Sequence, residues 1–387
     1  MTNTPQNNTK TIIAIIAAVT VMGLSLSLSI PLVSLALERR GIGSDVIGYM
    51  GALPALAFLF FSPLVPRLSH TFGAGKMLWA ALILCSGSIF CLALTEEIYI
   101  WFILRLGIGV GMSILFLISE TWINQVAEEK TRGRTVGIYV AFLTGGFALG
   151  PVLINLLGSE GSFPFIIASV IVSAAGFFFL ASGGHYPSLS GHSRFSVFTF
   201  IKIAPLICSA ALLVAFFDGS VLTLLPIYGV KNGMSAETAV LMTSILLGGN
   251  ILLQLPIGWL ADIAGREKVI LICGIIGLAG SLLLPLLINI PYLLWPMLVI
   301  WGGAVVGTYT LALVLMGQEF KGAELVTANA AAGVLWGVGS LVGPAAGGVA
   351  MEIYEPHGMS FVFTFVCFLF VCIALWQTLK RPVLSKP

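Results

Sequence analysis

The sequence predicts an all-α membrane protein in which twelve transmembrane helices form two pseudo-symmetric six-helix bundles. Three observations lead to this fold class: an apolar composition, apolar runs of spanning length, and motifs that recur at a fixed offset. Of the 387 residues, 58% are hydrophobic and only 9% are charged. A soluble domain carries about 25% charged residues, so a chain of this composition needs the lipid bilayer as its solvent.

Each predicted helix is an apolar run bounded by charges or turn residues, because about 20 apolar residues are needed to cross the hydrocarbon core. The runs lie at 11–37, 45–65, 76–95, 98–124, 133–157, 163–182, 204–229, 236–258, 268–289, 292–317, 323–350 and 359–380. We expect bundles at 1–182 and 204–387, joined by a cytoplasmic linker at 183–203. The first run is too long for the core of a signal peptide, so we expect it to remain as the first span.

The distribution of Lys and Arg predicts the orientation. With both termini in the cytoplasm, 14 of the 18 cations lie on that side, while Arg39, Arg40 and Lys231 lie outside and Arg105 lies within a span. We expect a multi-pass protein of a bacterial inner membrane that works as a monomer. The scattered cations offer nothing for nucleic acid to bind. The six cysteines lie in apolar runs without a C-x-x-C pair, so we expect neither a metal nor a cofactor.

Two motifs recur between the halves. The segment G-F-A-L-G-P at Gly146–Pro151 returns as G-S-L-V-G-P at Gly339–Pro344, an offset of 193 residues. The segment G-W-L-A-D-I-A-G-R-E-K at Gly258–Lys268 has a degenerate copy 192 residues earlier, with His70 and Ala74 in place of its Asp and Arg. Nearly equal offsets indicate a duplication, and both halves begin on the same side, as in parallel repeats. Two halves that move against each other are the architecture of a transporter.

Three motifs resemble those of the major facilitator superfamily over essentially the whole chain. They are a loop motif (Gly258, Asp262, Gly265, Arg266, Lys268), R-x-x-x-G-x-G (Arg105, Gly109, Gly111) and G-x-x-x-G-P-x-x-G-G (Gly339, Gly343, Pro344, Gly347, Gly348). The run S-E-T-W-I-N at 119–124, followed by T-R-G-R-T-V-G from Thr131, is similar to the YcaD-like branch of bacterial carriers.

The resemblance implies a secondary active transporter that works by alternating access, with one central site between the halves. In this family the motif around Asp262 is a latch that closes the cytoplasmic side and releases when the halves rock apart. The alternative is that the positive charges of this loop only set the orientation of the chain in the membrane, while Asp262 is solvated. An enzyme is not expected, because the chain contains neither H-E-x-x-H nor G-x-S-x-G.

Arg105 is the residue whose burial costs most, about 2.5–3.5 kcal/mol near the bilayer centre. Its guanidinium stays charged, so it needs carbonyl groups, an acid or an anionic substrate as a partner. We expect it to organise a proton relay or to anchor substrate. The alternative is an Arg that reaches outward to loop carboxylates such as Glu96 and Glu97.

Asp218 lies well inside the seventh run. A carboxylate withdrawn from water is costly to keep charged, which suits a group that binds and releases a proton. We expect Asp218 to be the titrating acid and Arg105 its partner. The alternative is an Asp bonded to helix ends, with Gly219 marking a break in the helix.

Other candidates are weaker. Asn250 and Gln254 are four residues apart and share a helix face, where they either line a pocket or bond neighbouring helices. Further candidate lining residues are Asn329, Trp336, Tyr139 and Tyr309. Glu120, near the cytoplasmic end of the fourth run, is expected to form an ion pair with Arg132 or Arg134. The glycine–proline motifs are expected to bend helices, through Gly146, Gly150, Pro151, Gly339, Gly343, Pro344, Gly347 and Gly348.

For the direction of transport we expect proton-coupled export of a small organic solute, because the glycine–proline pattern resembles that of proton-linked exporters. Its first-half copy, however, has Ile154 and Asn155 where exporters carry two glycines. The alternative is therefore an importer or facilitator of a small metabolite on the same fold. The expected partners are the lipid bilayer, a small-molecule substrate and protons.

Overall fold

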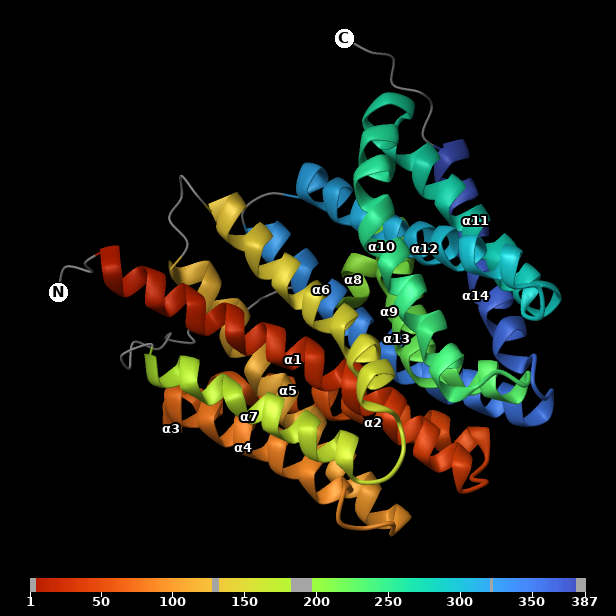
Figure 1. Ribbon diagram of the computed structural model, residues 1–387. Coiled ribbons are helices and arrows are strands. Elements are labelled where there is room, and N and C mark those ends of the chain that lie inside the picture. The colour runs from red at the N-terminus through yellow and green to blue at the C-terminus, as the bar shows by residue number, and fades with distance from the viewer. Residues whose placement is uncertain (1–4, 127–131, 182–196, 321–322, 381–387) are drawn as a thin grey trace. The chain divides into compact units, whose positions relative to one another are not determined.

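The fold is helical throughout the part of the chain that the computed structural model describes, which comprises residues 5–126, 132–181, 197–320 and 323–380. No strand occurs in these ranges (Figure 1). The helices are α1 Pro5–Arg39, α2 Ser44–Phe61, η1 Ser62–Leu64, α3 Val65–Phe72, α4 Ala74–Leu92, α5 Ile98–Val126, α6 Arg132–Leu157, α7 Phe163–Ala181, α8 Val197–Ile203, α9 Pro205–Lys231, α10 Ala236–Ala264, α11 Arg266–Leu287, α12 Pro291–Glu319, α13 Ala323–Ile353 and α14 Gly358–Lys380.

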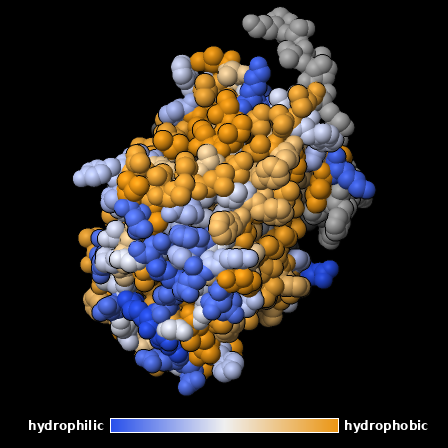
Figure 2. All heavy atoms as spheres, turned by 90° about the vertical axis from the view of Figure 1, so that its right-hand side faces the viewer, coloured by the Kyte–Doolittle hydropathy of each residue, from blue (hydrophilic) through white to orange (hydrophobic). Residues whose placement is uncertain are grey.

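The predicted fold class is confirmed. Within the described residues, 11 helices are long and apolar enough to cross a membrane, and the shorter apolar stretch Gly145–Leu157 in α6 supplies a twelfth. Many of their side chains point outward, such as Leu252, Leu255 and Trp259 of α10, which are 68%, 85% and 68% exposed. Apolar residues cover much of the face shown in Figure 2. Such a surface suits contact with lipid.

Local sequence signals fix the helix ends. Pro205 and Pro291 begin α9 and α12, in the first turn, where proline's missing N–H removes no helical hydrogen bond. Ser235 caps α10, because its side chain accepts a hydrogen bond from the Thr238 N–H at 3.3 Å. Gly73 and Gly265 each form the whole connection between two helices, with φ of 86° and 93°. Both angles lie in the region that favours glycine.

Contacts divide the chain into two units. Unit 1 comprises Met1–Ala36 and Leu53–Gly191, and unit 2 comprises Leu37–Ala52 and His192–Pro387. Helices α1 and α2 therefore each belong partly to both units. In unit 1, α4 packs against α5 and α7; in unit 2, α11 packs against α12 and α14. The second part of the expected linker forms α8, and residues 182–196 lie outside the described ranges.

Equivalent glycines meet equivalent positions in the two units. A Cβ placed on Gly146 would lie 3.1 Å from the Leu24 nitrogen, and one on Gly339 would lie 2.9 Å from the Phe216 nitrogen. The two glycines are 193 residues apart in the sequence, and their two partners are 192 residues apart. These separations match the offsets between the repeated sequence motifs. The two units thus repeat one packing pattern, in agreement with the duplication seen in the motifs.

Candidate functional site

Arg105 lies inside unit 1. It is 0% exposed on α5, and its Nη1 donates a hydrogen bond to the Ser29 hydroxyl oxygen of α1 at 3.1 Å. Ser29 is equally buried. This burial argues against an Arg that reaches outward to Glu96 and Glu97, which are both exposed. The sequence did not single out Ser29, which is one of several serines in the first span.

Asp218 lies inside unit 2, on α9. Its Oδ1 atom is buried and has no hydrogen-bond partner within the described residues. The residue as a whole is half-buried. The preceding residue, Phe217, packs edge-on against Trp301 with ring centroids 4.8 Å apart. Helix α9 continues through Gly219, so the expected alternative of a helix break at that glycine is not supported.

A short chain of hydrogen bonds joins α10 to α12. Gln254 Nε2 donates to Asn250 Oδ1 at 2.9 Å, and the Thr310 hydroxyl donates to Gln254 Oε1 at 2.6 Å. Asn250 and Gln254 thus share a face, as expected. The Thr310 bond crosses between helices, which favours the interhelical role of these amides over a purely pocket-lining one.

The other residues that were expected to line a solute pocket are Tyr139, Trp336, Tyr309 and Asn329. Tyr139 is 4% exposed, and its hydroxyl, like the buried indole nitrogen of Trp336, has no hydrogen-bond partner among the described residues. Tyr309 is half-buried on α12. The side chain of Asn329 lies outside the described part of the structure.

The motif around Asp262 is more helical than the sequence suggested. Gly258 and Asp262 lie in α10, which continues to Ala264, so the expected loop starting at Gly258 is wrong. Gly265 alone makes the turn. Asp262 Oδ1 lies 3.4 Å from Arg266 Nη2, with side chains 69% and 28% exposed. Lys268 is also exposed, in the first turn of α11.

The expected ion pair of Glu120 stays a prediction. Glu120 is exposed on α5. The side chains of Arg132 and Arg134 lie outside the described residues, although both residues belong to α6.

The glycine–proline motifs lie at close helix contacts. Pro151 and Pro344 are inside the continuous helices α6 and α13. A Cβ on Gly150 would overlap Ser27, one on Gly343 would lie 2.6 Å from the Ser220 hydroxyl, and one on Gly347 would lie 2.7 Å from Leu224. These glycines therefore let helices approach closely, which adds to the bending role that the sequence suggested.

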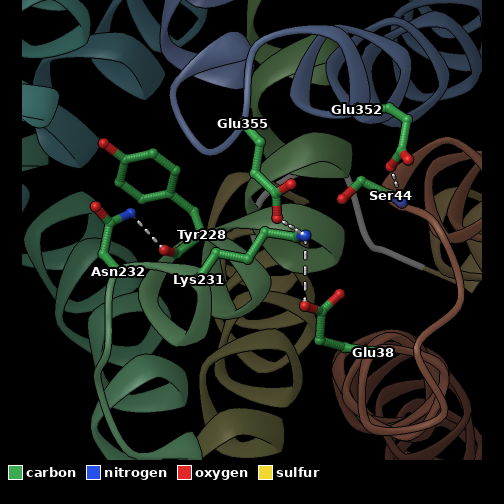
Figure 3. A network of polar contacts seen from close by, with 7 residues as sticks. All are labelled: Glu38, Ser44, Tyr228, Lys231, Asn232, Glu352 and Glu355. Atoms are coloured by element: carbon green, nitrogen blue, oxygen red, sulfur yellow. Dashed lines mark hydrogen bonds and ion pairs between the residues drawn. The ribbon is translucent and has the colours of Figure 1, made fainter.

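A polar cluster that the sequence reasoning missed lies at one end of unit 2 (Figure 3). Lys231 Nζ contacts Glu355 Oε1 and lies 3.6 Å from Glu38 Oε1. The Ser44 N–H donates to Glu352 Oε2 at 2.8 Å. We call these five residues the outer cluster, and this end the outer end, because the charge bias predicts that it faces outward. The available signal was that Glu38, Lys231, Glu352 and Glu355 all lie near outer ends of predicted spans.

Comparison with known proteins agrees with this architecture. The chain is 28% identical over 384 residues to an uncharacterized MFS-type transporter, YfkF, of Bacillus subtilis (strain 168), covering 96% of this chain and 95% of that protein. It is 23% identical over 328 residues to the uncharacterized MFS-type transporter YcaD of Salmonella paratyphi B (strain ATCC BAA-1250 / SPB7), covering 84% and 83% of the two chains.

Among solved structures, the D323A mutant of the nucleoside transporter NupG superposes with a TM-score of 0.77 at 14% identity, covering 96% of this chain and 99% of that one. This likeness concerns the fold. A family model described as Major Facilitator Superfamily matches residues 15–242 and 207–387. The repeated helix packing, the membrane spans and this match together identify the chain as a member of the Major Facilitator Superfamily.

Proposed function

We propose that this MFS transporter is a secondary active carrier that works by alternating access and exports a small organic solute in exchange for protons. The observation that carries the proton coupling is Asp218, a carboxyl group inside a membrane span whose Oδ1 atom is buried without a hydrogen-bond partner in the described structure. A carboxylate in such surroundings is stabilised either by a proton or by a cationic group. Asp218 is therefore the titrating acid of the proposal.

Arg105 is the second residue of the proposed coupling machinery. Its charge is permanent, and its bond to Ser29 fixes one edge of the guanidinium inside unit 1. A fixed interior cation can attract an anionic group of a solute or influence a titrating acid through its field. The Ser29 hydroxyl is a positioning partner, because it orients the guanidinium without being able to titrate itself.

The other candidates have supporting roles in the proposal. Asn250, Gln254, Asn329, Trp336, Tyr139 and Tyr309 contribute polar and aromatic groups to solute binding. The motif of Gly258, Asp262, Gly265, Arg266 and Lys268 acts as a cytoplasmic latch, and Glu120 pairs with Arg132 or Arg134. The Lys and Arg bias supports cytoplasmic termini. The proposal places the protein in a bacterial inner membrane, with a monomer as the working unit.

The test compares cells that contain the wild-type protein, the Asp218→Asn variant or no transporter at two external pH values. Intracellular metabolites and added drugs are measured by mass spectrometry. The wild type is expected to change the level of at least one solute in a pH-dependent way. Asp218→Asn is expected to lose this pH-driven component while retaining solute exchange. Glu97→Gln is the matched control, because it neutralises an exposed carboxylate that has no role in the proposed coupling site or in the latch.

The same measurement separates the directions of transport. A solute that is depleted inside cells containing the protein supports export, and one that accumulates supports the importer or facilitator alternative. An Asn variant whose transport keeps the full pH dependence of the wild type would contradict the role of Asp218.

A further inference from the structure

The amides of Asn250 and Gln254 lie on the side of α10 that is turned away from lipid. Leu252, Leu255 and Trp259 mark the opposite, exposed side of the same helix. At about 100° per residue, Asn250 lies roughly 140–180° around the helix from these three side chains. Asn250 and Gln254 are both half-buried, and α10 packs against α9 and α12 within unit 2. The two amides are therefore shielded from lipid without being sealed inside the core.

The hydroxyl group of Thr310, on α12, sets the direction of the hydrogen bonds that these amides make. A hydroxyl group has only one proton to donate. The Thr310 oxygen lies 2.6 Å from Gln254 Oε1 and 3.3 Å from the Val306 carbonyl oxygen of its own helix. Because the contact with Gln254 is the shorter one, the proton is donated to Gln254. The oxygen of the Gln254 amide therefore faces α12, and its nitrogen faces Asn250.

Asn250 is the last residue of this chain of hydrogen bonds. Gln254 Nε2 donates to Asn250 Oδ1 at 2.9 Å, so the oxygen of the Asn250 amide faces Gln254. The nitrogen of the same amide, Nδ2, has no hydrogen-bond partner within the described residues. It carries two N–H donors. Thr310, acting through Gln254, thus fixes the Asn250 amide with its donors available to another molecule.

We propose that Thr310 is a positioning residue for solute specificity, which directs the N–H groups of Asn250 to an acceptor oxygen of the solute. The group recognised is the carbonyl oxygen of an amide or the oxygen of a carboxylate. An ammonium group at the same point is rejected, because it has no lone pair and would leave the N–H donors unpaired. The inference rests on the proposed role of the two amides in solute binding, and it names the chemical group that they bind.

Three probes of nearly equal shape test which group is bound. Benzamide carries a neutral amide, benzoate a carboxylate and, at neutral pH, benzylamine an ammonium group. Their dissociation constants are measured on the purified full-length protein in lipid nanodiscs, from the rise of the unfolding temperature with probe concentration. The wild type is expected to bind benzamide and benzoate more tightly than benzylamine. Tighter binding of benzylamine, or binding of none of the three, would overturn the assigned solute group.

Thr310→Val removes the hydroxyl group and keeps the shape of the side chain. It is expected to weaken benzamide binding about fivefold, as for one lost hydrogen bond, and to leave benzylamine binding unchanged. Thr310→Ser keeps the hydroxyl group and is expected to bind benzamide as the wild type does. Thr364→Val is the matched control, because the half-buried Thr364 hydroxyl donates to the Ser360 carbonyl oxygen of its own helix at 2.8 Å. Equal losses in Thr310→Val and Thr364→Val, or equal losses for benzamide and benzylamine, would overturn the role of Thr310.

A double-mutant cycle separates positioning from general packing. If Thr310 acts through Gln254, then Thr310→Val should cause no further loss of benzamide affinity once Gln254→Leu is present. Additive losses would show that Thr310 acts by another route, and the positioning role would be rejected.

Asn250→Asp replaces the NH₂ group by an oxygen of similar size. This variant should prefer benzylamine to benzamide, the reverse of the wild-type order, and an unchanged order would contradict the proposal. Asn250→Ala, which should lose the discrimination between the probes, takes its place if the Asp variant does not unfold cooperatively. All these measurements are made at one pH and without a gradient. Their failure therefore leaves the proton coupling of Asp218 to be judged by its own test, and a failure of coupling leaves these affinities unchanged.

Discussion

The two ends of unit 2 use the same kinds of charged residues in different ways. At the outer end, Lys231 is partly buried between Glu38 and Glu355, which come from distant segments of the chain. At the Gly265 turn, Asp262 and Arg266 are four residues apart and more exposed. An ion pair can hold separate segments together only when its partners belong to different segments. The contacts of Lys231 with Glu38 and Glu355 can therefore hold separate segments together, whereas the Asp262–Arg266 contact by itself stabilises only one turn.

The largest effect is expected from Gly348→Val, which puts a side chain into the contact between α13 and α2 next to the outer cluster. The new Cβ would lie 2.9 Å from the Gly48 Cα, and overpacking of this kind costs about 1–3 kcal/mol. Transport of a solute identified by the pH screen should fall about tenfold or more, since about 1.4 kcal/mol corresponds to a factor of ten. Gly333→Val is the control on the same helix, because a Cβ there meets nothing within 4 Å. Equal losses in the two variants would show that this contact is not important for transport.

Glu38→Gln should have the second largest effect. Glu38 is 16% exposed and Glu355 is 58% exposed, so the Glu38 contact is less screened by water. We expect Glu38→Gln to lower the free energy of unfolding by up to about 1 kcal/mol, and Glu355→Gln to lower it less, as measured by thermal unfolding of the purified variants. A larger effect of Glu355→Gln would show that the contact within the second repeat, rather than the contact with residues 37–52, stabilises the outer end.

Asp262→Asn should slow transport severalfold without changing which solute is bound. The stability of the protein should fall by only about 0.3–0.5 kcal/mol, as for other exposed pairs one helical turn apart. Initial transport rates, the binding constant for the identified solute and thermal unfolding are measured on the same preparations. A change in selectivity would contradict the latch role and place Asp262 in solute recognition instead.

Tyr228→Phe should have the smallest effect on transport. The Tyr228 hydroxyl lies 2.9 Å from His357 Nδ1, and both residues belong to the second repeat, so this contact does not attach residues 37–52. The loss of one hydrogen bond should lower stability by about 0.5–1.5 kcal/mol. Transport of the solute identified by the pH screen should stay at the wild-type rate. A slower rate would show that transport depends on the packing of α9 against the α13–α14 connection.

The spans were predictable because the energetic demand of the bilayer dominates their composition. Details that depend on turn geometry were not: α10 runs past the expected end at residue 258 to Ala264, because a single glycine suffices for the connection. Helix α2 ends at Phe61, before a 3₁₀ turn that contains Pro63. Proline and glycine signal such breaks, but hydropathy alone does not locate them.

Some residues of the candidate site could be predicted from the sequence, and others could not. Arg105 and Asp218 stood out because a charge inside an apolar run is rare and costly. Ser29 and Thr310 did not, since short hydroxyl side chains are common in membrane helices and often bond their own backbone. The contact of Ser29 with Arg105 spans 76 residues of sequence, and that of Thr310 with Gln254 spans 56. Only the packing of helices reveals such partners.

The division of α1 and α2 between two units has a pharmacological consequence. The connection after α1, residues 40–43, and the connection after α9, residues 232–235, both belong to the outer end of unit 2. An antibody fragment that binds both connections at the same time would hold residues 37–52 in place. Such a binder should arrest the carrier without competing with its solute, so its inhibition should not be relieved by raising the solute concentration.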